Sequence, residues 1–154
     1  MKPLKAILCA LCFCCPVLFS SDAFDPFDPK EKQRVAKELY AESMKLSGDF
    51  HVAQYKLYTK GEKSSPEEVD VLAAVMKRIA ILRTRMLQAT NGWNPPSYWK
   101  ESQKQAELIR FKICTDRLEA LPDLNLAPPF SRENINQARM TLDAACAMTA
   151  FLGY

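Results

Sequence analysis

Histidine and glycine are scarce in this sequence, and their scarcity argues against several classes of enzyme. His51 is the only histidine among 154 residues, so a Ser–His or Cys–His catalytic pair would have to use it. Asp49 is close in sequence, but residues two apart on a helix do not face each other. Only four glycines occur, and none forms a phosphate-binding loop. We therefore assign no catalytic residue and favour a non-enzymatic protein. An enzyme that uses carboxylates or His51 is the alternative.

The usual signals of metal, haem and nucleic-acid sites are also missing. No Cys-x-x-Cys-His or Glu-x-x-His motif is present, which argues against covalent haem and a di-iron bundle site. The 21 basic and 18 acidic residues nearly balance, whereas nucleic-acid binders carry a strong basic excess. We therefore predict no metal, no cofactor and no nucleic-acid partner.

The first 23 residues have the pattern of a secretory signal peptide. Lys2 and Lys5 precede an apolar run over residues 6–19, and Ser21-Asp22-Ala23 offers small residues where signal peptidase reads. The run is short for a bilayer span, which takes about 17–25 residues. We therefore expect cleavage after Ala23 and a periplasmic or secreted protein without an integral membrane span.

A lipid anchor is the alternative to simple cleavage, because four cysteines lie in the apolar run: Cys9, Cys12, Cys14 and Cys15. Acylated bacterial cysteines normally follow small residues, and these follow bulkier ones. An uncut leader would make palmitoylation conceivable. Cleavage removes Lys2, Lys5 and Asp22, which reduces 21 basic and 18 acidic residues to 19 and 17. This near-neutral balance gives no reason to expect electrostatic adhesion to membranes.

The stretch from Ser65 to Ala89 is the strongest helix in the sequence. Ser65 suits an N-cap, Pro66 suits the first helical position, and Glu68 completes a capping box. Apolar residues then repeat at helical spacing: Val69, Leu72, Met76, Ile79, Leu82 and Met86. Other apolar side chains widen this stripe, and a helix apolar over most of its circumference packs on several sides. We predict the central helix of a bundle.

Three further helices are expected around it. The first begins at Asp28-Pro29 and runs to about residue 59, either unbroken or interrupted near Gly48. Its apolar seam extends from Val35 to Leu57. The third is expected to be capped by Ser97 and to end near residue 121, with Ile109 and Ile113 in its apolar seam. The fourth is capped by Ser131.

These patterns predict an all-α fold, with a single domain of about four helices over residues 24–154. Pro26 and Pro29 each favour an extended conformation in the residue before them, so we expect residues 24–28 to form an extended arm carrying Phe24 and Phe27. Docking of the two rings on the bundle is the favoured interpretation, and contact with a partner is the alternative. No strand-like alternation is long enough to build a sheet.

Cys114 and Cys146 are the cysteines that remain after cleavage. An even pair in an exported protein predicts a disulfide, which would join the last two helices. The alternative is two buried free thiols, because cysteine packs as a small apolar residue. Two cysteines and one histidine are too few for a typical structural zinc site.

Two groups of residues are candidates for binding a partner. Trp93, Tyr98 and Trp99 surround a proline-rich loop, and such rings are frequent at binding hot spots, although they also clamp loops onto a core. Arg78 and Arg85 belong to a basic cluster on the central helix. That cluster is either an acidic-partner site or a solvated strip whose side-chain stems cover apolar neighbours.

The sequence therefore predicts an exported helical protein that acts by protein–protein interaction, such as an adaptor, inhibitor or immunity-type factor. The alternative is a bundle that binds a small apolar or lipid ligand in a cavity lined by aromatic rings and methionines. The identity of the partner and the oligomeric state are not indicated by the sequence.

Overall fold

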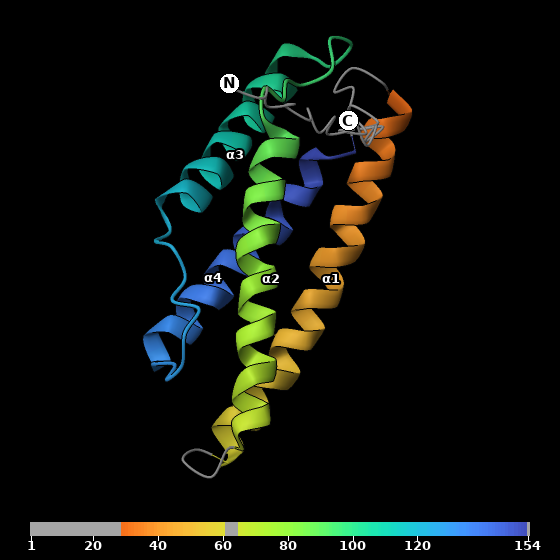
Figure 1. The fold of residues 1–154 in the computed structure, drawn as a ribbon. Helices are drawn as coiled ribbons and strands as arrows, with labels where there is room; N and C mark the ends of the chain where they lie inside the picture. The colour runs from red at the N-terminus through yellow and green to blue at the C-terminus, as the bar shows by residue number, and fades with distance from the viewer. Residues whose placement is uncertain (1–28, 61–64, 154) are drawn as a thin grey trace, which may run out of the picture.

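The computed structural model describes residues 29–60 and 65–153, and it is an all-α bundle (Figure 1). The elements are α1 (Pro29–Lys60), α2 (Pro66–Thr90), α3 (Glu101–Ala120), α4 (Arg132–Met148) and a short 3-10 helix, η2 (Thr149–Phe151). Within these ranges there is no strand. The prediction of an all-α bundle with four helices is confirmed. The expected leader and the extended arm at 24–28 lie outside the described residues.

The start of α2 is fixed by the capping box that the sequence predicts. The Ser65 hydroxyl accepts a hydrogen bond from the Glu68 N–H at 3.4 Å, and the Glu68 carboxylate accepts one from the Ser65 N–H at 3.1 Å. Lys60 donates to the same carboxylate at 2.6 Å. These bonds, first from Lys60 and then from the Ser65 backbone, hold the pKa of Glu68 below its ordinary value. The cap thus also ties α2 to the end of α1.

α2 is the central element, with α1 and α3 on either side and α4 behind it in Figure 1. Its apolar stripe is buried from Leu72 to Met86, and α1 and α4 also contribute buried apolar residues to the core. The completely buried side chains of the three helices include Leu39, Leu46, Phe50, Leu72, Met76, Ile79, Leu82, Met86 and Met148. The predicted central helix is therefore the centre of the core.

α1 continues as one helix through Gly48, so the unbroken alternative is the observed one. α2 ends at Thr90, and Gly92 follows with a φ of 69°, a left-handed conformation that glycine adopts without strain. The Trp93 N–H then donates to the Thr90 carbonyl at 3.0 Å. Gly92 therefore terminates α2.

α3 differs from its prediction in its start and in its buried face. It begins at Glu101 because residues 97–99 form a turn in which the Trp99 N–H donates to the Pro96 carbonyl at 3.2 Å. Ile109 and Ile113, expected in the apolar seam, are 60% and 59% exposed. Leu118 is the one residue of α3 that is buried. α3 is thus a peripheral helix that packs mainly through half-buried side chains.

Candidate functional site

The structure separates the three aromatic residues that the sequence groups as a candidate binding site. The Trp93 ring centroid lies 4.9 Å from those of both Phe111 and Phe151. Trp93 therefore joins α3 to the end of the chain, which is the packing role left open by the sequence. Trp99 is half-buried, and Tyr98 is 80% exposed. Of the three rings, Tyr98 is the one that solvent reaches most fully.

The Trp93 indole has an unusual polar environment. Its Nε1 atom is buried and has no hydrogen-bond partner in the described part of the chain. Phe111 and Phe151 also contact each other, with ring centroids 5.2 Å apart and planes at 80°. The rings of Phe111 and Phe151 thus place apolar surface against the indole. We call Trp93, Phe111 and Phe151 the aromatic cluster.

The candidate arginines of α2 are used in ion pairs with α1. Arg78 Nη1 lies 3.0 Å from Asp49 Oδ2, while Arg85 pairs with Glu42 and lies 3.8 Å from Glu38. All of these side chains are partly exposed, and such pairs contribute about 0–1 kcal/mol each. Arg78 and Arg85 therefore balance acidic residues within the bundle, and nothing in their geometry singles out an acidic partner.

Arg83, a third arginine of α2, contacts the end of α3 instead. Its guanidinium donates to the Glu119 carbonyl at 3.3 Å and to the Pro122 carbonyl at 3.4 Å. These carbonyls lie at a helix C-terminus, where positive charge is favourable. Arg83 also lies 3.4 Å from Asp123 Oδ1. Its role in the structure is to hold α3 and the following segment against α2.

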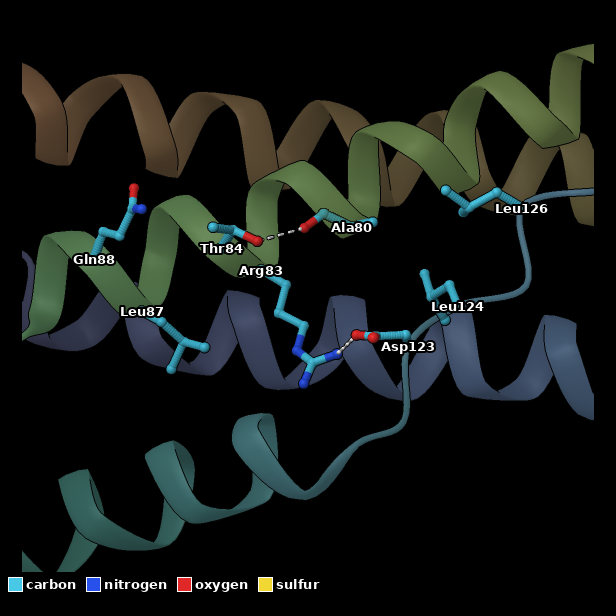
Figure 2. A pocket seen from close by; sticks show the side chains of 8 residues that line it. All are labelled: Ala80, Arg83, Thr84, Leu87, Gln88, Asp123, Leu124 and Leu126. Carbon is cyan, nitrogen blue, oxygen red and sulfur yellow. Dashed lines mark hydrogen bonds and ion pairs between the residues drawn. The ribbon is translucent and has the colours of Figure 1, made fainter.

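A pocket of about 410 Å³ opens beside Arg83, between α2 and the segment after α3 (Figure 2). Its lining consists of Ala80, Arg83, Thr84, Leu87, Gln88, Asp123, Leu124 and Leu126. No aromatic ring or methionine is part of this lining. Met76, Met86 and Met148 are instead completely buried in the core. The pocket therefore lacks the lining expected for the small-ligand alternative.

The structure gives no support to a Cys114–Cys146 disulfide, because both residues are free thiols. Cys146 points towards α1, where its Sγ lies 3.9 Å from the Ser43 carbonyl oxygen. Cys114 is on α3, a helix that makes most of its contacts with α4. The contact of Cys146 with α1 depends on the folded arrangement of the helices, which sequence spacing could not show.

The partly buried position of Cys146 gives a testable pH dependence. Burial raises the pKa of the Cys146 thiol above its ordinary value, so the folded state holds this proton more tightly than the unfolded chain does. The resulting stabilisation is complete below the ordinary thiol pKa and is lost as pH rises through the raised pKa. The free energy of unfolding can be measured by urea denaturation at about pH 8 and at about pH 10. We expect it to fall less over this range in Cys146→Ala than in the wild type. Equal losses would contradict this assignment.

The largest exposed apolar feature of α1 lies on the side of the helix away from the core. Tyr40, Met44, Gly48 and Val52 follow one another at steps of four residues, and Tyr55 comes three later. Such steps place side chains on one face of a helix. Tyr40 and Met44 are each 56% exposed, Val52 is 57% exposed and Tyr55 is 69% exposed. We call these five residues the α1 outer face.

No acidic residue interrupts the α1 outer face. The acids of this part of α1 point to α2, where Glu42 and Asp49 pair with Arg85 and Arg78. The exposed Lys37 and Lys45 form no ion pair with a described residue. The result is an apolar strip with basic residues beside it.

The α1 outer face was not predicted from the sequence. The signal was present, because the residues repeat at steps of four and three. It was hidden by the stronger seam of Leu39, Leu46 and Phe50, which accounts for the core.

No protein-family model, curated protein or solved structure matches the chain. Among residues 29–60 and 65–153, no group of three or more histidine, cysteine or acidic side chains could hold a metal ion. None of the helices described is long and apolar enough to cross a membrane.

Proposed function

We propose that this protein is an exported, non-enzymatic helical protein that acts by binding another protein through the α1 outer face. One observation carries the proposal: four large apolar side chains lie in one strip and are 56–69% exposed. Single exposed apolar residues are ordinary, whereas contiguous apolar patches mark interaction sites. The strip presents on the order of 500 Å², because a fully exposed tyrosine presents roughly 200 Å². A patch of this size is among the largest on typical monomers.

The composition of the strip also suits protein recognition. Tyrosine and methionine are enriched at protein interfaces, and tyrosine supplies contact area at a low cost in conformational entropy. The core of the bundle is complete without these side chains, since Leu39, Leu46 and Phe50 form the buried seam of α1. An adaptor, an inhibitor and an immunity-type factor all fit this description. The proposal that the protein is exported depends on the leader pattern at residues 1–23.

Paired substitutions test the binding surface. The full chain, carrying a C-terminal tag and expressed in its native compartment, is captured with its bound proteins as wild type, as Tyr55→Glu and as Ile109→Glu. Ile109 is a matched control, because it is 60% exposed but lies on α3. We expect Tyr55→Glu to reduce the recovered partner at least tenfold, because a charge then replaces a desolvated ring. Ile109→Glu should leave it unchanged.

The opposite pattern, or equal recovery in all three, would refute binding through this face. Circular dichroism of each bait shows that a loss of partner is not a loss of fold. The mass of the recovered bait tests export separately. A chain that begins at Phe24 is expected, and an intact leader would contradict the proposed processing.

A further inference from the structure

Gly48 lies at the centre of the α1 outer face. Nothing in the described part of the chain requires a glycine at this position. Its backbone is helical, and Gly92 is the glycine with a positive φ. A Cβ built on Gly48 would meet no atom within 4 Å, so no neighbour excludes a side chain there. A glycine inside a helix is less favourable than alanine at the same position. Close approach of another backbone is one condition that makes glycine useful.

The apolar residues are arranged symmetrically around this glycine. Met44 and Val52 lie four residues before and after it, while Tyr40 and Tyr55 lie eight before and seven after. If two identical helices crossed antiparallel at Gly48, Met44 of each copy would therefore lie against Val52 of the other copy. Tyr40 of each copy would lie near Tyr55 of the other. This reciprocity is the property of a two-fold symmetric interface, in which residue i meets residue j and j meets i.

We propose that the α1 outer face binds the same face of a second copy of this chain, antiparallel, with the two-fold axis at Gly48. This inference rests on the proposed function, since it names the partner of the same surface. Packed helices lie about 8–10 Å apart, and the shortest separations need small residues at the crossing point. Gly48 supplies one from each copy, and Ala41 on the same side is also small.

The exposed area suits a reversible dimer. In the dimer, the four apolar side chains of each copy would be buried. Together the two copies would bury on the order of 1,000 Å², based on roughly 200 Å² for a tyrosine. Specific interfaces begin at about 1,000–1,200 Å². We therefore expect a dimer that forms in the micromolar range.

The charges favour the antiparallel arrangement over a parallel one. In a parallel pair, Lys37 and Lys45 of one copy would each lie beside the same lysine of the other copy. In the antiparallel pair about Gly48, Lys37 is level with Thr59 and Lys45 is level with His51. Like charges brought directly together destabilise helix pairs. The neighbouring acids cannot relieve a parallel pair easily, because Glu42 and Asp49 are engaged by α2.

Sedimentation of the purified full chain from about 1 to about 200 µM tests the association. We expect the wild type to shift from monomer to dimer across this range. Met44→Asp should raise the dissociation constant at least tenfold, while the control Ile109→Asp should leave it unchanged. A wild-type monomer throughout, or an equal effect of both substitutions, would overturn the dimer.

Single cysteines test the geometry. In a background in which all six natural cysteines are replaced by serine, Gly48→Cys should form an intermolecular disulfide at position 48 under mild oxidation, as located by peptide mass mapping. Ala41→Cys should not link to itself, because antiparallel pairing separates the two copies of residue 41 by about 21 Å along the axis. Efficient linkage at both positions would indicate a parallel pair, and no linkage at position 48 would place the axis elsewhere. Either result overturns the proposal.

The same variants separate this inference from the proposed function. If the protein is monomeric but Tyr55→Glu still loses a different captured protein, the second copy is wrong and the binding surface stands. If substitutions on the α1 outer face alter neither self-association nor capture, both proposals fail.

Discussion

Phe50→Ala is expected to lower the free energy of unfolding by about 3–5 kcal/mol, which is the usual cost of removing a fully buried aromatic side chain. Phe50 is completely buried on α1, the helix that covers one side of α2. Domains of ordinary size are stable by only about 5–15 kcal/mol. The variant should therefore unfold at a much lower urea concentration, as followed by circular dichroism.

A matched substitution on the same helix shows whether burial is the cause. Val52 is two residues away and 57% exposed, so Val52→Ala should change stability by less than about 0.5 kcal/mol. Similar midpoints for the two variants would mean that the buried face of α1 has been assigned wrongly. That result would also remove the distinction between the core seam and the α1 outer face.

The starts of α2 and α4 were predictable because they depend on local sequence, whereas Ser97 does not cap α3, which begins at Glu101. Ser65 and Ser131 each form the capping box that their neighbours three residues later allow, and the central stripe of α2 follows helical spacing without interruption. These interactions involve residues within one turn of each other. Tertiary context therefore had little opportunity to override them.

The buried face of α3 was not predictable in the same way. Ile109 and Ile113 have the spacing of a core seam, yet the helix turns them outward and packs through Phe111 and Leu118. The choice depends on Trp93 and Phe151, which lie on other elements and meet Phe111 in the folded chain. The spacing of apolar residues along one helix contains no information about such partners.

The candidate site residues also show the difference between what local sequence predicts and what tertiary contacts decide. Trp93, Arg78 and Arg85 are residue types common at interfaces, but in the fold each has a partner within the bundle. The α1 outer face became visible when the core was known, because exposure distinguishes its tyrosines from packed ones. The proposal that the protein binds through this face therefore needed the fold as well as the composition.

Trp93→Ala is expected to destabilise the protein by about 2–4 kcal/mol, somewhat below the about 3–5 kcal/mol typical of fully buried tryptophan, because Trp93 is only half-buried. The aromatic cluster is a main attachment of α3, in which Leu118 alone is buried. Loss of the indole should therefore release α3 before the rest of the bundle. Amide hydrogen exchange should accelerate most in residues 101–120, because local opening exposes the least stable unit first.

Two further substitutions separate packing from binding at this position. Trp93→Phe should cost far less than Trp93→Ala, since a ring remains and the Nε1 atom loses no hydrogen bond among the described residues. Tyr98→Ala should be nearly neutral, because Tyr98 is 80% exposed. If Trp93→Ala instead kept its urea midpoint and slow exchange in α3 but lost a captured partner, the indole would be a binding residue. The aromatic cluster would then not be what holds α3 to the bundle.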